Sequence, residues 1–342
     1  MAKELISQRD SPPVCLKAYN GGFSFGVDIL IESKTYCELK SILQNEKNIN
    51  IISDEHCISL LKTYGYFNLI NNYKTDLTET LKHEIVSIDD LVHLKEFDND
   101  LQSLVFKNLI KIETTLKSHL SYLMATKFGV TENEYKNHFS YKNHISAKKV
   151  FKNIENKKHI NFNKLPAKHY KDKYNDIPPW VYLKHIPLGD TLNIFKELNT
   201  DDKAEIINEW PEFQQFAVKD KIEIFIELIY FCKDFRDSIA HGGRLLNYIS
   251  DKKIKFTLLE KMLKPSIMNK KEFSTYSGGF FLLTLIITIL LPSLKEKNRF
   301  SQEFRSFYNL YLQETENHFL EMFHMVANLP ENYVIRLQNT IW

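Results

Sequence analysis

The sequence is poor in the residues that interrupt helices. Its 342 residues include only ten glycines and ten prolines, the two residue types that most often mark turns and end helices. Long stretches follow the helical period of 3.6 residues, and strand-like alternation is confined to residues 22–31. No internal repeat is evident in the chain. These features predict an all-α protein.

Cysteine is also scarce. The four cysteines are Cys15, Cys37, Cys57 and Cys232. None has C-x-x-C spacing, so neither a zinc knuckle nor a disulfide framework is indicated. The first residues, MAKELISQRDSPP, lack the apolar core of a signal peptide, and we expect a cytoplasmic protein. His318, Glu321 and His324 have helical spacing, but they spread over a third of the circumference, which favours a plain helix face. We expect neither a metal nor another cofactor.

Long hydrophobic runs and a large net charge are missing too. The strongest apolar run, from Phe280 to Leu291, is twelve residues long, whereas a membrane span needs about 20. It predicts a buried core helix. Lysine and arginine total 45 against 43 acids, for a net charge of +2. A nucleic-acid surface would therefore require local clustering of positive charge.

Such a cluster occurs at residues 142–173. The segment holds ten lysines against two acids, Glu155 and Asp172, with aromatic and amide residues between them. One interpretation is a solvated, mobile insertion between helices. The other is a phosphate-binding arm that also stacks on bases. The lysines that we expect to bind RNA are Lys148, Lys149, Lys152, Lys157, Lys158, Lys168 and Lys171.

Two segments carry strong helical patterns. In the first, Ser87 and Asp90 have the spacing of a capping box, and Gly129 marks the end. Its apolar stripe comprises Leu101, Val105, Leu109, Ile112, Leu116, Leu120 and Leu123. The second runs from about Asp220 to Ala240 and ends at Gly242-Gly243, a typical C-terminal cap. Shorter helices are expected at 36–43 and 55–73, and an amphipathic segment at 300–327.

The end of the second helix reads Arg236-Asp-Ser-Ile-Ala-His241. Arginine binds phosphate oxygens through a planar fork of donors, and histidine exchanges protons near neutral pH. Together they have the chemistry to cleave RNA without a metal. With six arginines and 12 histidines in the chain, random placement yields about 0.6 such Arg-x4–6-His matches. The spacing alone therefore proves little.

A purely structural interpretation exists for the same residues. Arg236 would pair with an acid such as Asp237 or Glu227, and His241 would only cap the helix, because cations favour that end. On an ideal helix, positions i and i+5 lie about 140° apart. Arg236 and His241 would then act together only if the helix unwinds at the glycines or if two protomers share one cleft.

Four blocks in order resemble the Abi-like (AbiD/AbiF) abortive-infection family. The first is Leu60 to Tyr73, with its Tyr-Gly-Tyr-Phe-x-Leu signature, and the second is Phe97 to Gly129 around Ile112-Glu113. The third is Pro179-Trp180 to Gly189. The fourth, Arg236 to Asn247, is similar to the family's Arg-Asn-x-x-Ala-His-x-x-Arg-Leu-x-Asn. Asp237 replaces the usual Asn, and Gly242 stands where His is frequent.

This resemblance implies a branch of the HEPN superfamily, with helical bundles whose Arg-x4–6-His motifs meet across a two-fold axis. It implies a metal-independent endoribonuclease toxin in phage defence, which leaves 2′,3′-cyclic phosphate and 5′-hydroxyl ends, and in some relatives a small noncoding RNA antitoxin. His241 would be the general acid or base, Arg236 the phosphate binder, and Asp237 the residue that orients either. Arg244 and Asn247 would contact the RNA backbone or brace the loop.

We therefore expect a HEPN-like helical bundle at residues 35–250, with the lysine-rich insertion 142–173. An N-terminal arm at 1–34 and a C-terminal helical extension at 251–342, packed on the core, would flank it. Because the motif occurs once per chain, a homodimer is the natural partner arrangement. No membrane is expected. The alternative function is a non-catalytic RNA-binding module that holds a structured RNA.

Overall fold

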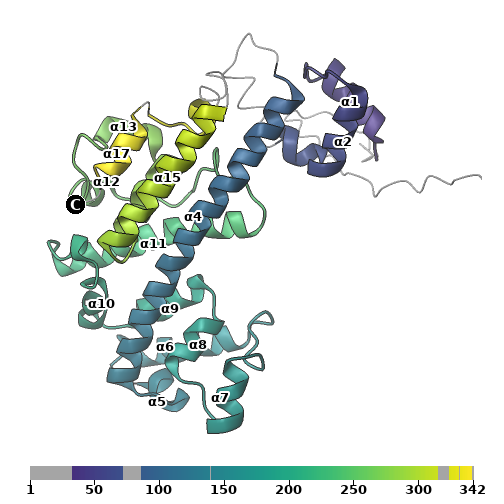
Figure 1. The fold of residues 1–342 in the computed structure, drawn as a ribbon. Coiled ribbons are helices and arrows are strands. Elements are labelled where there is room, and N and C mark those ends of the chain that lie inside the picture. Colours follow the sequence, from purple (N-terminus) through teal and green to yellow (C-terminus); the bar gives the residue numbers. More distant parts are fainter. Residues whose placement is uncertain (1–32, 72–85, 139, 315–322, 331, 341–342) are drawn as a thin grey trace, which may run out of the picture. The chain divides into compact units, whose positions relative to one another are not determined.

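Helices form the whole framework of the part of the chain that the structure describes. The computed structural model describes residues 33–71, 86–138, 140–314, 323–330 and 332–340. Within these ranges there is no strand, only two isolated bridge pairs, and the all-α prediction is confirmed (Figure 1). The expected alternation at 22–31, nearly all of the expected N-terminal arm, Tyr73, His318 and Glu321 lie outside the described residues.

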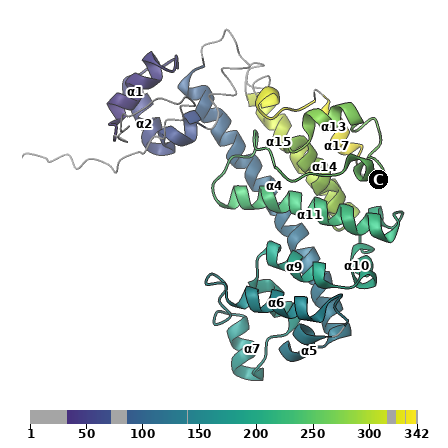
Figure 2. The ribbon, with the colours of Figure 1, turned by 180° about the vertical axis from the view of Figure 1, so that it is seen from behind.

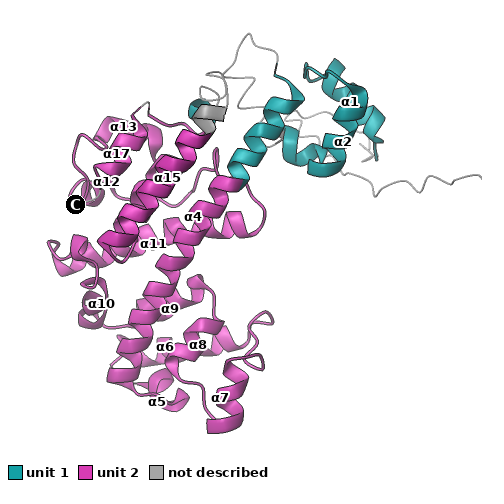
Figure 3. Cartoon of the chain, viewed as in Figure 1, with its two compact units in different colours: residues 1–99, 321–326 teal, residues 100–320, 327–342 magenta. Residues whose placement is uncertain are grey.

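The chain divides into two compact units, coloured separately in Figure 3. Unit 1 comprises residues 1–99 and 321–326, and unit 2 comprises residues 100–320 and 327–342. The described part of unit 1 contains α1 (Tyr36–Asn45), α2 (Asp54–Tyr64), the π-helix η1 (Phe67–Asn71) and the start of α4. The single helix expected at 55–73 is a wrong prediction. Gly65 adopts φ +78° and ends α2 at Tyr64, because only glycine takes this conformation at little cost.

Helix α4 (Ile88–Leu123) confirms the stronger of the two helical predictions. Ser87 and Asp90 form the expected reciprocal cap: the Ser87 N–H donates to Asp90 Oδ2 at 2.9 Å, and the Asp90 N–H donates to Ser87 Oγ at 3.1 Å. Every residue of the predicted stripe is buried. The π-helix η2 (Met124–Phe128) continues α4 and ends at Gly129, where φ is +110°.

The other helices with complete bounds in the described residues belong to unit 2. They are α5 (Glu132–Asn137), α6 (His144–Glu155), α7 (Ala167–Tyr174), α8 (Pro179–His185), α9 (Leu188–Glu197), α10 (Thr200–Ile207), η3 (Pro211–Phe213), α11 (Val218–Ala240), α12 (Phe256–Leu259), α13 (Lys270–Tyr276), α14 (Phe280–Leu290), α15 (Leu294–Glu314) and α17 (Tyr333–Gln338).

Helix α11 is held by an aromatic cluster. The centroid of the Phe225 ring lies 5.1 Å from that of Trp210, 5.4 Å from that of Phe213 and 5.8 Å from that of Phe195. Trp210 Nε1 donates to the Leu290 carbonyl at 2.7 Å, which joins the cluster to α14. Buried aromatic pairs of this kind add stability beyond their area. The N-terminal part of α11, which leads to the motif, is therefore packed in the core.

Helix α14 is buried along its entire length, which confirms the core-helix prediction for this apolar run. None of the described helices combines the length and apolar character that crossing a membrane requires. Helices α13 and α14 satisfy the criterion only when taken together, and they are bent by 110° relative to each other.

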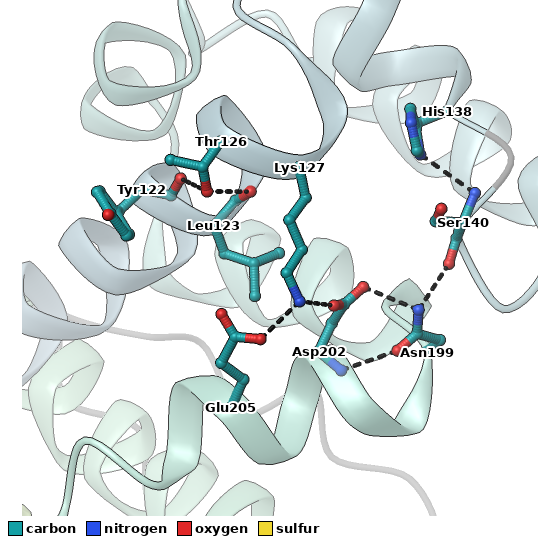
Figure 4. Close-up of polar contacts among 9 residues, drawn as sticks. All are labelled: Tyr122, Leu123, Thr126, Lys127, His138, Ser140, Asn199, Asp202 and Glu205. Atoms are coloured by element: carbon teal, nitrogen blue, oxygen red, sulfur yellow. Dashed lines mark hydrogen bonds and ion pairs between the residues drawn. The ribbon is translucent and has the colours of Figure 1, made fainter.

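A polar network ties the end of η2 to α10 (Figure 4). Lys127 Nζ donates to Asp202 Oδ1 at 2.7 Å and to Glu205 Oε2 at 2.5 Å. Asn199 caps α10 and links it to the segment after α5, because its Nδ2 donates to the Ser140 carbonyl at 3.1 Å. Asp202 is buried, so its charge needs these partners. The network anchors α10, which precedes α11, to the end of the long helix.

Candidate active site

The motif region begins where α11 ends. The helix stops at Ala240, and His241 is the capping residue with φ −97° and ψ 14°. Gly242 adopts φ +74°, and its N–H donates to the Ile239 carbonyl at 3.0 Å, while the Gly243 N–H donates to the Ser238 carbonyl at 2.8 Å. This pair of bonds defines a Schellman motif, in which the residue after the cap takes a left-handed conformation. The glycines thus end the helix as predicted.

Arg236 lies between two carboxylates. Its Nη1 donates to Asp237 Oδ1 at 2.9 Å, and its Nε lies 3.4 Å from Glu113 Oε2 of α4. Arg236 Nε and Glu113 Oε2 are buried and make no hydrogen bond within the described residues. Helix α11 crosses α4 (Figure 2), and this ion pair joins the two helices. Arg236 therefore has an acidic partner on its own helix and another on α4.

Glu113 is itself neutralised by a lysine one turn further along α4. Lys117 Nζ donates to Glu113 Oε1 at 2.7 Å and to the carbonyl of Ile186 at 2.6 Å. Ile186 directly follows α8. Lys117 therefore fixes the chain between α8 and α9 next to the same carboxylate that faces Arg236.

Asp237 also has two cationic partners. Lys233 Nζ donates to Asp237 Oδ2 at 2.6 Å, in addition to the bond from Arg236. Partial burial raises the pKa of Asp237, but the hydrogen bonds and positive charges of Lys233 and Arg236 outweigh that effect and hold the pKa below its usual value. The Lys233 stem lies over Gly189 of α9, where an added Cβ would be only 2.7 Å from Lys233 Cε.

The cluster formed by Glu113, Lys117, Lys233, Arg236 and Asp237 carries a net positive charge. Three cations face two carboxylates. The Arg236 side chain is 24% exposed and Asp237 is 34% exposed, whereas Glu113 is 8% exposed. Lys233, at 31%, is also partly exposed, so the exposed edge of the cluster is the one formed by Lys233, Arg236 and Asp237. A charge of this sign at a partly buried arginine suits an oxyanion such as a phosphodiester.

The structure places His241 at the exposed cap, one helical turn beyond Asp237. Its N–H donates to the Asp237 carbonyl at 3.1 Å, so the backbone of the histidine is fixed even though its side chain is exposed. Helix α11 is regular up to Ala240, and Arg236 and His241 are brought to the same helix end without a bond being formed between them.

Arg244 and Asn247 lie in the segment after the glycines, and both are partly buried. Leu245 and Leu246 anchor this segment in the core. Farther on, Tyr248 Oη and Ser250 Oγ both donate to Asp234 Oδ2 of α11, at 2.8 and 2.7 Å. Burial, the bond to Asp234 and its charge raise the pKa of Tyr248 to about 12. The segment that carries Arg244 and Asn247 is thus fastened to the motif helix.

The lysine-rich segment 142–173 contains two helices, which neither interpretation of the sequence included. Ala147, Phe151 and Ile154 of α6 are buried, and so is Ala167 of α7. Six of the seven lysines predicted to bind RNA are exposed: Lys148, Lys149, Lys152, Lys158, Lys168 and Lys171. These six exposed lysines lie on α6, α7 and the connection between them, and we refer to them together as the α6–α7 surface.

Lys157 differs from the other six. Its Nζ donates at 2.5 Å to Asp190 Oδ1, and Asp190 is only 3% exposed. Removing the lysine would leave a buried charge without compensation, so Lys157 has a structural partner in this fold. Asp190 is the neighbour of Gly189, on which the Lys233 stem lies. Helix α9 therefore connects the α6–α7 surface to the motif cluster.

Sequence reasoning missed the roles of Glu113, Lys117, Lys233 and Gly189 in this cluster. The pairs Glu113–Lys117 and Lys233–Asp237 are both at i,i+4 spacing, a recognisable signal on a helix surface. The structural interpretation had proposed Asp237 or Glu227 as the partner of Arg236. Asp237 is a partner, whereas Glu227 accepts from the Lys255 N–H at 2.9 Å. Among the described residues no group of three His, Cys, Asp or Glu side chains is arranged to hold a metal.

Residues from three of the four family blocks meet at this cluster. Glu113 belongs to the second, Ile186 and Gly189 to the third, and Arg236 and Asp237 to the fourth. A family model described as Abi-like protein matches residues 59–247. No curated protein and no solved structure matches the chain significantly. Because the matched region covers more than half of the 342 residues, the chain belongs to the Abi-like family of abortive-infection, or phage-defence, proteins.

Proposed function

We propose that the protein is a cytoplasmic, metal-independent endoribonuclease of the HEPN type that acts as a toxin in phage defence. The observation that carries the proposal is the convergence of three family blocks on Arg236, in a cluster with one net positive charge. Arg236 binds the scissile phosphate and stabilises the charge that develops on it. The protein's partners are RNA, either as the target or as a small noncoding RNA antitoxin, and a second copy of the chain.

The chemistry follows from the positions of the side chains. His241, exposed at the helix cap, takes the proton of the 2′-hydroxyl or protonates the leaving 5′-oxygen. Attack of the 2′-oxygen on phosphorus breaks the P–O5′ bond and leaves a 2′,3′-cyclic phosphate and a 5′-hydroxyl. Asp237 orients Arg236 through its bond to Nη1. Arg244 and Asn247 contact the RNA backbone or brace the loop, and the lysines of the α6–α7 surface bind flanking phosphates.

A two-protomer site resolves the geometry of the motif. Arg236 and His241 are separated by more than one turn at the end of a regular helix, and the chain contains one such motif. In a two-fold dimer the arginine and histidine of both protomers approach one RNA strand. A homodimer is therefore part of the proposal.

The decisive experiment uses RNA incubated with EDTA and either the natural protein or the His241→Ala variant. We expect cleavage by the natural protein with cyclic phosphate ends, and a loss of rate of roughly 100-fold or more in the variant, the usual contribution of a general acid or base. His93→Ala is the matched control, because His93 is also exposed but lies outside both the motif and the α6–α7 surface. Equal cleavage by the natural protein and His241→Ala would refute the assignment.

The second candidate is a non-catalytic module that holds a structured RNA. It is favoured by the fact that Arg236 already has two acidic partners, at 2.9 and 3.4 Å. In that case the α6–α7 surface and Arg236 would bind RNA, and His241 would do no chemistry. Binding without cleavage, unchanged by His241→Ala, would identify this function.

A further inference from the structure

Asp237 occupies the donors that a phosphate would need. Its two carboxylate oxygens accept from Arg236 Nη1 at 2.9 Å and from Lys233 Nζ at 2.6 Å. A carboxylate and a phosphate present similar oxygen pairs to a guanidinium group. The side chain of Asp237 therefore resembles a bound anion.

Asp237 is also the accessible one of the two acids beside Arg236. Glu113 is 8% exposed and its other oxygen is bonded to Lys117, so it belongs to the buried side of the cluster. Asp237 is 34% exposed. A ligand approaching Arg236 from solvent therefore meets the Asp237 carboxylate, which repels a phosphate in addition to occupying its donors.

We propose that Asp237 is an internal competitor for phosphate, which neutralises Arg236 and Lys233 in the free protein and must be displaced when an oxyanion binds. This inference rests on the proposed function only in naming RNA as the natural source of the oxyanion. The carboxylate remains charged at neutral pH because its partners hold its pKa low. A competing anion is therefore required to release Arg236 and Lys233 from Asp237. A small decrease in pH does not protonate Asp237 and does not release them.

Two substitutions separate the charge of Asp237 from its positioning role. Asp237→Asn keeps an oxygen that can accept from Arg236 Nη1, but removes the negative charge. Asp237→Ala removes both the charge and the acceptor. Both variants are expected to bind phosphate more tightly, whereas only Asp237→Ala also leaves Arg236 Nη1 without the acceptor that holds it in the free protein.

The first probe is inorganic phosphate, measured by its effect on thermal unfolding, because a ligand of the folded state raises the midpoint. We expect roughly tenfold tighter binding to Asp237→Asn than to the natural protein, equivalent to about 1.4 kcal/mol. The second probe is a fluorescent 2′-O-methyl RNA, which keeps the phosphates but cannot be cleaved. For this RNA, the slope of log affinity against log salt concentration should become steeper by about 0.7, the effect of one additional phosphate contact on a single strand.

Asp220→Asn is the matched control. Asp220 lies on the same helix and pairs with Lys261 at 3.0 Å. It is about 24 Å from Arg236 along the helix, several Debye lengths at physiological salt. The Asp220→Asn substitution removes the same charge as Asp237→Asn, so a general effect of net charge would appear in both variants. Phosphate and RNA affinity should be unchanged in Asp220→Asn.

The outcomes distinguish this inference from the proposed function. Tighter phosphate binding by both Asp237 variants supports the competitor role, whether or not the protein cleaves RNA. Unchanged or weaker phosphate binding by Asp237→Asn overturns it, even if the natural protein is an active ribonuclease. Tighter phosphate binding without RNA binding would keep the oxyanion site and refute the proposed RNA function.

Discussion

Gly242 and Gly243 end the motif helix for different physical reasons. Gly242 has φ +74° but open space around the position of a Cβ atom, so its requirement is conformational. Gly243 has no such φ, but its Cβ would lie 2.8 Å from the Ser238 carbonyl oxygen and 2.4 Å from Ser238 Oγ. Its requirement is steric, because the chain turns back onto the last turn of α11.

This difference predicts unequal effects of alanine. Gly242→Ala should lower the free energy of unfolding by about 1 to 2 kcal/mol, the cost of a left-handed non-glycine residue. Gly243→Ala should cost more, because a backbone oxygen cannot move aside without breaking the Schellman motif. Urea unfolding of both variants measures the difference. Equal costs would show that the close approach at Gly243 is not tight in solution.

At the scale of elements, α6 and α7 combine a structural face and a basic face. The inner residues of α6, Ala147, Phe151 and Ile154, are buried, whereas Lys148, Lys149 and Lys152 are exposed. A helix with one buried stripe can vary its outer face without losing its packing. The basic residues of α6 are therefore separable from its stability.

Replacing Lys148, Lys149 and Lys152 together by glutamine should leave stability within about 0.5 kcal/mol, as is usual for surface positions. If all three lysines contact phosphates, the slope of log affinity for single-stranded RNA against log salt concentration should become shallower by about 2. A matched triple variant uses exposed lysines of α13 and α15: Lys270, Lys271 and Lys295. Equal losses of RNA affinity in the two triple variants would mean that only net charge matters.

For the whole molecule, the single motif makes the number of protomers decisive. A site built from two copies exists only in the dimer, so its activity depends on protein concentration. A site completed within one chain has no such dependence. Concentration therefore separates the two arrangements without any substitution.

Below the dissociation constant of the dimer, the cleavage rate per protomer should fall roughly tenfold for each tenfold dilution. Cleavage assays and sedimentation over the same concentration range provide the test. A constant rate per protomer at concentrations where sedimentation detects only monomer would exclude a shared site.

Much of the fold was predictable because its signals are local. The periodic stripe of α4, the Ser87–Asp90 cap and the glycine stop of α11 depend on neighbours within a few residues. The failure at 55–73 was also local in origin. The apolar pattern continues through the segment, but Gly65, with φ +78°, ends α2, and a separate π-helix follows.

The sequence by itself determined the helical class, the ends of the main helices and the residues of the motif, because short-range periodicity and capping encode them. Only the tertiary structure decided that Glu113 faces Arg236, that Lys157 is bound to Asp190, and that the Lys233 stem lies on Gly189. These pairs join segments far apart in the sequence, and their contact depends on how side chains fill the core. A one-dimensional pattern does not specify that packing.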